Sequence, residues 1–141
     1  MNSGKINIGL IGLGRLGQLY AGYLSSKVRG CCLVGVCDVK ESLAETTAQE
    51  FGVQNWCLDF QDILDRKDID AVVITTSTSA HYELVKRAMD CGKPTFCEKP
   101  LTVSLQDSLD IKKVVDDCAG FLQMGFMRRF DRGFLSAKHK I

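Results

Sequence analysis

Three glycines near the amino terminus constrain the fold of this chain more than any other feature. Gly12, Gly14 and Gly17 follow an apolar run at residues 6–11. At this spacing the first glycine permits a tight turn, the second lets a phosphate approach the backbone, and the third lets a helix lie close to a sheet. The free N–H groups at the start of that helix, together with its dipole, would hold an anion. The motif therefore predicts a strand, a turn and a helix that bind a phosphate group.

The residues after the glycines strengthen this interpretation. Apolar side chains recur with the period of an amphipathic helix, at Leu16, Leu19, Tyr20, Tyr23 and Leu24. A second apolar run, residues 31–37, ends at Asp38, where a carboxylate could accept hydrogen bonds from an adenosine ribose. The pattern favours a dinucleotide-binding βαβ unit, and a glycine-tolerant turn in some other α/β domain is the alternative.

Size and composition fit one globular domain. The chain has 141 residues, 45% of them hydrophobic and 25% charged, and its net charge of +1 gives no reason to expect nucleic-acid binding. It has no apolar run near the roughly 18 residues of a membrane span, and no signal-peptide pattern, so we expect a cytoplasmic protein with no membrane partner. Seven cysteines without a Cys-x-x-Cys pair, and only two histidines, favour buried, reduced thiols over disulfides or a metal site.

Strand and helix patterns alternate along the chain. We expect strands at residues 5–11, 31–38, 56–57, 71–75, 95–97 and 121–124, and helices at 15–26, 41–51, from Asp59 to about Arg66, 79–91, and from Ser104 to about Cys118. Helices of crossover length between strands imply parallel pairing, with helices on both faces of the sheet. The fold class is therefore α/β, a doubly wound and mostly parallel six-stranded sheet with strand order 3-2-1-4-5-6.

In such a sheet, ligands lie at the carboxyl ends of the strands. The glycine loop (residues 12–17), the hydroxyl-rich residues 75–78 and residues 98–100 should therefore meet at one edge. The hydroxyl groups could bind phosphate or ribose, or could cap the next helix. Lys99 could stabilise the charge on a substrate hydroxyl that loses its proton, although Glu-Lys-Pro is also common in surface turns. His81 fits a buried structural histidine as well as a catalytic one.

Several of these segments together resemble the amino-terminal domain of the Gfo/Idh/MocA family of NAD(P)-dependent oxidoreductases, and its inositol 2-dehydrogenase-like members in particular. The segments are the glycine loop, Asp38, residues 71–81, residues 96–100 and residues 125–131. They occur in the family's order and cover nearly the whole chain. The Glu-Lys-Pro element and the Gly-Phe-x-Arg-Arg-Phe element are more specific than the glycine spacing.

The resemblance implies a Rossmann fold that binds NAD, with NADP as the alternative. The cofactor-binding residues that it implies are Gly12, Gly14, Arg15, Leu16, Gly17, Asp38, Thr75, Thr76, Ser77, His81, Glu98, Lys99 and Pro100. Lys99 would be the catalytic residue, directed at both the nicotinamide and the substrate. The family's peptide bond before Pro100 is typically cis.

The resemblance also implies hydride transfer between a cyclitol or sugar hydroxyl and the nicotinamide. The family's second, α+β substrate domain, which carries an Asp-x-x-x-His element, has no counterpart in this sequence. We therefore expect a cofactor-binding domain at residues 1–127, a crossover that begins at 128–141, and little or no turnover by this chain alone. A freestanding nucleotide-binding or redox-sensing module and an inactive scaffold are the alternatives. A homo-oligomer could form through exposed apolar residues at Leu101, Phe126, Phe130 and Phe134.

Overall fold

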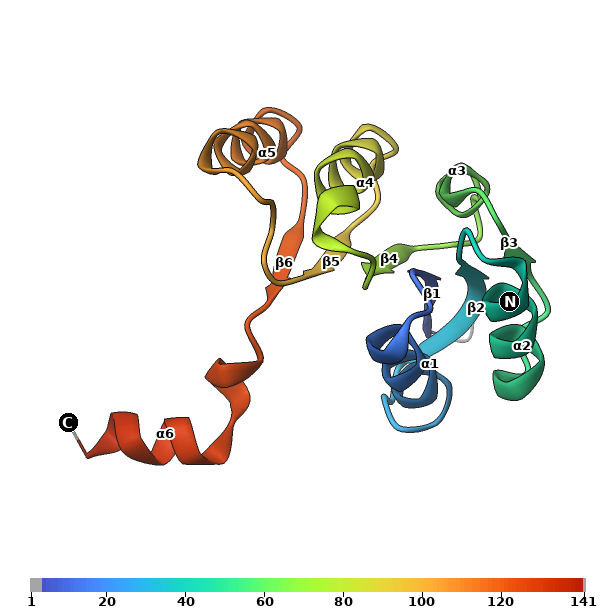
Figure 1. Cartoon of the computed structure of the whole chain (residues 1–141), viewed down its shortest axis with the longest axis horizontal. Coiled ribbons are helices and arrows are strands. Elements are labelled where there is room, and N and C mark those ends of the chain that lie inside the picture. Colours follow the sequence, from blue (N-terminus) through green and yellow to red (C-terminus); the bar gives the residue numbers. More distant parts are fainter. Residues whose placement is uncertain (1–3, 141) are drawn as a thin grey trace.

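One parallel sheet organises the chain, and a computed structural model describes it over residues 4–140 (Figure 1). Within these residues the strands are β1 (Ile6–Ile11), β2 (Cys31–Cys37), β3 (Trp56–Cys57), β4 (Ala71–Ile74), β5 (Thr95–Glu98) and β6 (Leu122–Gly125). Their order in the sheet is β3-β2-β1-β4-β5-β6, and every neighbouring pair is parallel. This confirms the predicted order and fold class.

Helices cover both faces of the sheet. They are α1 (Arg15–Ser26), α2 (Glu41–Phe51), α3 (Phe60–Leu64), α4 (Thr78–Asp90) and α5 (Leu105–Asp117). Helices α1 and α2 lie on one face, and α3, α4 and α5 lie on the other (Figure 1). Each face buries its own apolar cluster, so the sheet is the middle layer of three.

Most element ends fall within one residue of the predicted positions. The main difference is α3, which ends at Leu64 and not near Arg66. Its start is as predicted, because the Asp59 carboxylate accepts a hydrogen bond from the Gln61 N–H at 2.8 Å. On α4, one face is buried, and it consists of His81, Leu84, Val85, Ala88 and Met89.

The predicted apolar face of α1 is wrong in part. Its buried residues are Gly17 and Ala21, with Tyr20 and Leu24 partly buried beside them. The other three predicted members are exposed, Leu16 at 42%, Leu19 at 52% and Tyr23 at 47%. Small residues carry the contact because they let the helix axis come close to the sheet, which turns the larger side chains outward.

The cysteines are less buried than expected. All seven are free thiols, but only Cys37 and Cys97 are buried, and Cys118 is exposed at the end of α5. The prediction of buried thiols is therefore wrong for Cys118. Burial raises the pKa of the Cys97 thiol to about 12, and the Glu98 carboxylate adds to this effect.

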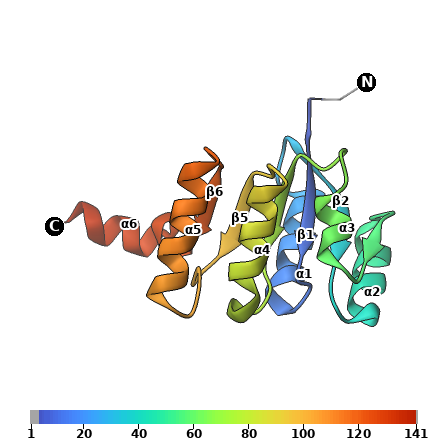
Figure 2. The ribbon, with the colours of Figure 1, turned by 90° about the horizontal axis from the view of Figure 1, so that it is seen from above.

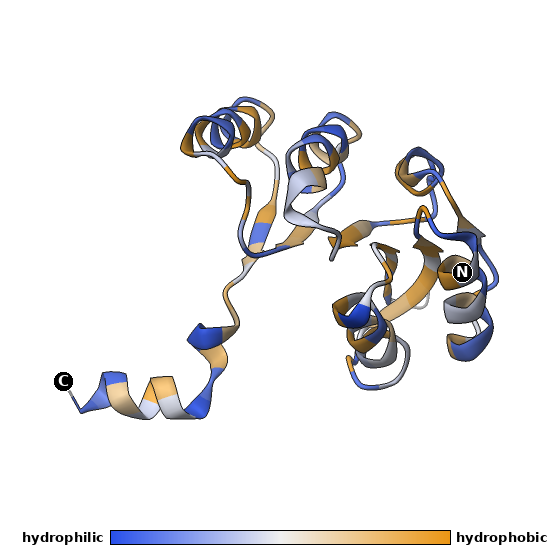
Figure 3. Cartoon of the chain, viewed as in Figure 1, coloured by the Kyte–Doolittle hydropathy of each residue, from blue (hydrophilic) through white to orange (hydrophobic). Residues whose placement is uncertain are grey.

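The chain leaves the sheet after β6. The short 3₁₀ helix η1 (Met127–Phe130) and α6 (Arg132–His139) extend away from the sheet, and we call residues 126–140 the arm (Figure 2). Apolar residues of the arm are exposed, for example Phe130 at 76%. Apolar stretches occur both in the strands, which run between two layers of helices, and in the arm, which stands apart from those layers (Figure 3). Leu101 contradicts the prediction of exposure, because it packs against the α4–α5 cluster.

Among residues 4–140, no helix is both long enough and apolar enough to cross a bilayer.

Candidate functional site

The glycine loop joins β1 to α1 in the geometry that its spacing predicts. Gly12 has a φ of +92°, which favours glycine, and a Cβ there would lie 2.6 Å from the Thr76 nitrogen. A Cβ at Gly17 would overlap the Gly12 carbonyl oxygen. A Cβ at Gly14, by contrast, would meet no atom within 4 Å. Two of the glycines are therefore required by packing, and Gly14 leaves open space through which a ligand can reach the backbone.

The end of β2 is tied to this loop through Asp38. One carboxylate oxygen accepts a hydrogen bond from the Leu13 N–H at 2.7 Å, and the other accepts one from the Lys40 N–H at 2.9 Å. The N-cap of α1, Gly14, provides no side-chain hydrogen bond to the helix. The first N–H groups of α1 are thus not capped by their own N-cap residue, which is the arrangement that binds anions at helix amino termini.

The end of β4 supports the loop from the other side. Thr75 is buried, and its hydroxyl donates to the Gly12 carbonyl oxygen at 2.6 Å. Within the hydroxyl-rich segment, Thr75 therefore fixes the end of β4 to the glycine loop, whereas Thr76 and Ser77 line the cavity beside it.

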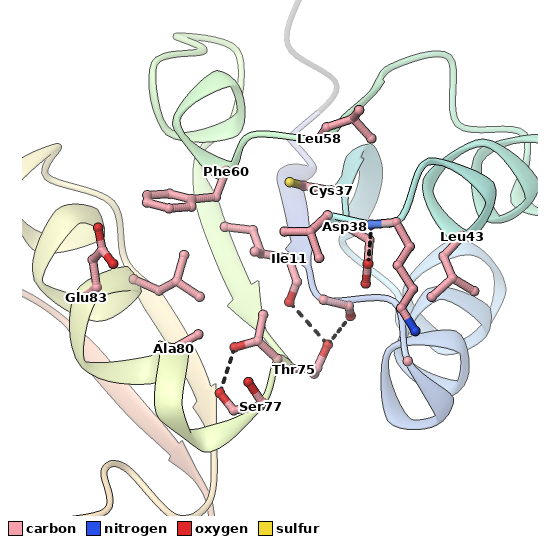
Figure 4. A pocket seen from close by; sticks show the side chains of 16 residues that line it. Ile11, Cys37, Asp38, Leu43, Leu58, Phe60, Thr75, Ser77, Ala80 and Glu83 are labelled. Carbon is pink, nitrogen blue, oxygen red and sulfur yellow. Dashed lines mark hydrogen bonds between the residues drawn. The ribbon is translucent and has the colours of Figure 1, made fainter.

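A cavity of about 490 Å³ lies between these strand ends (Figure 4). Of the predicted cofactor residues, it is lined by Gly12, Gly14, Asp38, Thr75, Thr76 and Ser77. The others lie outside its wall: Arg15, Leu16, Gly17, His81, Glu98, Lys99 and Pro100. Sequence analysis missed the apolar part of the wall, which includes Leu43, Leu58 and Phe60. Leu58 and Phe60 follow a two-residue strand, which is too short to place its neighbours from the sequence.

His81 lies on α4, outside the cavity wall, and is only 1% exposed. Its Nδ1 is 2.8 Å from the Pro100 carbonyl oxygen, and its Nε2 is 3.2 Å from the Thr76 carbonyl oxygen. The ring therefore connects the loop after β4 with the loop after β5. This geometry matches a positioning role more closely than proton transfer to a ligand.

Glu98 ends β5 as a buried carboxylate, 6% exposed. It accepts hydrogen bonds from the Tyr20 hydroxyl at 2.6 Å and from the Lys99 N–H at 3.1 Å. A Cβ at Gly125 would lie 2.9 Å from its carboxyl carbon, so only glycine leaves room for it. Burial, followed by the hydrogen bond and the charge of Glu98, raises the pKa of Tyr20 well above its usual value. Sequence analysis did not identify Tyr20, because its partner is 78 residues away.

Lys99 follows Glu98 and is exposed. Its peptide bond to Pro100 is cis, as the resemblance predicts. None of the ion pairs that the structure describes in residues 4–140 includes Lys99. In the same residues, no group of three or more His, Cys, Asp or Glu side chains could hold a metal ion.

Comparison with known protein families identifies the family to which the chain belongs. The profile of the Gfo/Idh/MocA family, described as an oxidoreductase family with an NAD-binding Rossmann fold, matches residues 6–126. The chain belongs to this family.

Individual relatives support the assignment. The chain is 40% identical over 137 residues to a scyllo-inositol 2-dehydrogenase (NAD(+)) of Bacillus subtilis, covering 97% of this chain and 40% of the relative. It is 33% identical to a myo-inositol 2-dehydrogenase of Thermotoga maritima, covering 96% and 40% of the two chains. The crystal structure of scyllo-inositol dehydrogenase from Lactobacillus casei with bound NAD(H) and scyllo-inositol matches with a TM-score of 0.91 at 33% identity, over 96% and 40% of the two chains. The chain thus spans about 40% of the length of these relatives.

The cofactor of this domain is NAD, and the residues present fit it. Gly14 leaves space at an uncapped helix terminus, where a pyrophosphate would be held. Asp38 places a carboxylate at the end of β2, where the adenosine ribose lies in folds of this class. The apolar wall between these groups offers a surface for a planar base.

Proposed function

We propose that this chain is the cofactor-binding part of an oxidoreductase that transfers a hydride between a cyclitol hydroxyl and NAD. One observation carries the proposal. The cavity is bounded by the glycine loop, which follows β1, and by Asp38, which follows β2, and the exposed Lys99 directly follows β5, two strands away from β1. The inositol substrates of the relatives favour a cyclitol over other alcohols.

Different residues along the carboxyl edge of the sheet would bind different parts of NAD. Gly12, Gly14 and the start of α1 would hold the pyrophosphate, and Asp38 would accept hydrogen bonds from the adenosine ribose. Thr76 and Ser77 lie further along the same edge, towards β5, where their hydroxyls could bind the second ribose.

Lys99 would supply the chemical contribution of this chain. NAD, when bound, supplies the hydride acceptor. The Lys99 ammonium would stabilise the oxygen of the substrate hydroxyl as it loses its proton. Because Lys99 has no carboxylate partner among the described ion pairs, its charge is free for this contact. The proton acceptor of the family belongs to the Asp-x-x-x-His element, which residues 1–141 do not contain.

A binding titration and a turnover assay on this chain test the proposal. We expect NADH fluorescence to saturate in a titration and NAD to compete with NADH for the site. We expect little or no reduction of NAD with scyllo-inositol or myo-inositol, because the proton acceptor is not in this sequence. Failure of NADH to saturate the protein up to about 1 mM would overturn the binding role. Rapid turnover would contradict the assignment of the proton acceptor.

A further inference from the structure

Two cysteines stand next to each other at the carboxyl edge of the sheet, beside the cofactor cavity. Cys37 is the last residue of β2 and Cys57 the last of β3, and the two are register partners in parallel strands. We propose that Cys37 and Cys57 form a peroxide-sensitive thiol pair, and that its oxidation to a disulfide lowers the affinity of the cavity for NAD. The effect on affinity rests on the proposed function, whereas the oxidation does not.

The backbone geometry permits the bond. Neighbouring strands lie about 4.8 Å apart, within the roughly 4.4–6.8 Å that separates the Cα atoms of disulfide-bonded cysteines. Register partners in parallel strands point their side chains to the same face of the sheet. Both thiols accordingly belong to the apolar cluster covered by α3 and α4. The strand order and register stay as they are, and only a small local shift of the two strand ends is needed to bring the two sulfur atoms together.

The two thiols differ in reactivity. A hydrogen bond from the Cys37 thiol lowers the pKa of Cys57, and the charge of Arg66 acts in the same direction. Burial and the carboxylates of Asp59 and Asp62 oppose this effect without reversing it. The same hydrogen bond, with burial, raises the pKa of Cys37. Cys57 is also the more accessible of the two, and a partly exposed thiol that ionises readily beside a second thiol is typical of redox-sensitive sites.

The reaction balances with a hydroperoxide as the oxidant. The Cys57 thiolate attacks one oxygen of hydrogen peroxide, the O–O bond breaks, and Cys57 becomes a sulfenic acid while the other oxygen leaves as water after protonation. The Cys37 sulfur then attacks the Cys57 sulfur, the S–O bond breaks, and a second water leaves with the Cys37 proton. Two thiols and one hydrogen peroxide thus give one disulfide and two waters.

The bond would disturb the cofactor site whichever strand moves. The Cβ atoms of a disulfide lie about 3.8 Å apart, so neighbouring strands about 4.8 Å apart must shift locally. A shift at Cys37 moves Asp38, whose carboxylate accepts a hydrogen bond from the glycine loop. It also moves the Cys37 carbonyl oxygen, which accepts a hydrogen bond from the Gly12 N–H at 2.8 Å. A shift at Cys57 moves Leu58, the next residue and part of the cavity wall (Figure 4).

Peptide mapping and an NADH titration test both parts of the proposal on the same sample. The reduced protein is treated with a few equivalents of hydrogen peroxide and digested without a reductant. We expect a linked peptide pair that contains Cys37 and Cys57, and a dissociation constant for NADH at least about tenfold higher than that of the reduced protein. Dithiothreitol should separate the peptides and restore the affinity.

Two variants control the experiment. Cys57→Ser should keep its affinity for NADH after peroxide treatment, because it cannot form the bond. Cys118→Ser removes the exposed thiol and should still lose affinity, as the unmodified sequence does. The proposal is overturned if no Cys37–Cys57 peptide forms, or if the linked protein binds NADH as tightly as the reduced one. If the reduced protein fails to bind NADH, the proposed function fails, while the peptide map still decides whether the thiols react.

Discussion

The glycine-loop edge of the sheet and the arm differ in how their residues are held. At the edge, hydrogen bonds of 2.6–2.8 Å join the ends of three strands. The Gly12 N–H donates to the Cys37 carbonyl oxygen, the Leu13 N–H donates to the Asp38 carboxylate, and the Thr75 hydroxyl donates to the Gly12 carbonyl oxygen. In the arm, α6 packs against η1, and the aromatic side chains of the arm are exposed. A binding edge built from backbone and buried polar groups is already in position before the cofactor arrives. The arm has hydrogen bonds of its own, but all of its residues from 126 to 140 are exposed.

The largest effect should come from a methyl group at the tightest point of the edge. Gly17→Ala places a Cβ on the Gly12 carbonyl oxygen, which is backbone and cannot move aside cheaply. We expect a loss of about 3 kcal/mol in the free energy of unfolding and a fall in NADH affinity of about 100-fold or more. Urea denaturation and an NADH titration measure the two quantities.

The matched control lies on the same helix. A Cβ at Gly22 would lie 3.6 Å from the Phe51 ring, an ordinary contact, so Gly22→Ala should leave NADH binding unchanged. Because alanine is the better helix former, this variant should gain up to about 1 kcal/mol of stability. Equal behaviour of the two variants would show that the close approach of α1 to the loop does not matter.

A smaller effect is expected at the ribose side of the edge. Asp38→Ser removes the carboxylate that would repel a 2′-phosphate, while Lys40 and Arg15 keep positive charge nearby. The ratio of NADPH to NADH affinity should rise by about 100-fold, measured by parallel titrations. Asp116→Ser, at an exposed position of α5, serves as the control and should leave the ratio as it is. An unchanged ratio in Asp38→Ser would mean that this carboxylate does not face the ribose.

The third prediction concerns the link between α1 and β5. Tyr20→Phe removes the hydroxyl that donates to Glu98 but keeps the ring beside Phe96, 5.6 Å away between centroids. We expect the free energy of unfolding to fall by about 1–2 kcal/mol at neutral pH, because the buried Glu98 carboxylate loses a hydrogen-bond donor. Tyr23→Phe, on the exposed side of the same helix, should change stability by less than about 0.5 kcal/mol.

The native sequence and Tyr20→Phe should differ in the free energy of unfolding by an amount that depends on pH. This dependence follows from the pKa of Tyr20, which is raised in the folded protein. In the unfolded chain the phenol ionises near its ordinary pKa of about 10, while the folded protein keeps the proton. The contribution of Tyr20 is therefore complete below about pH 10 and is lost as the pH rises above it. Unfolding curves between pH 8 and pH 11 should show the gap between the native sequence and Tyr20→Phe narrowing at the alkaline end. A gap that stays constant or widens would contradict the assignment.

The sequence predicted the strands, the helices and the glycine-loop edge of the sheet better than it predicted contacts between residues far apart in the chain. The strand order follows from the alternation of strands and helices, which is typical of a doubly wound sheet. The buried face of α4 follows from local periodicity, because Leu84, Val85, Ala88 and Met89 recur at helical spacing after His81. The same reasoning failed on α1, where Gly17 and Ala21 are the buried residues. The prediction for α1 counted only large apolar side chains, and these two residues are small. A pattern of large apolar residues does not detect a contact that small residues make.

The site shows the same division. The glycine loop and Asp38 lie within 27 residues and follow a known spacing, so the sequence alone is enough to identify them. The Tyr20–Glu98 hydrogen bond and the Cys37–Cys57 pair join residues from different βα units, and they depend on how the strands are ordered and registered. Sequence spacing alone carries no information on such pairs.

The smallest effect is expected in the arm, and it tests the other half of the comparison. Phe130→Ala removes an aromatic ring that is 76% exposed, so the free energy of unfolding should change by less than about 0.5 kcal/mol. Phe96→Ala removes the same ring from the partly buried contact with Tyr20 and should cost about 2–4 kcal/mol. Urea denaturation of both variants gives the two values on one scale. A large loss in Phe130→Ala would show that the arm folds back onto the sheet in solution, and the contrast between the two regions would then disappear.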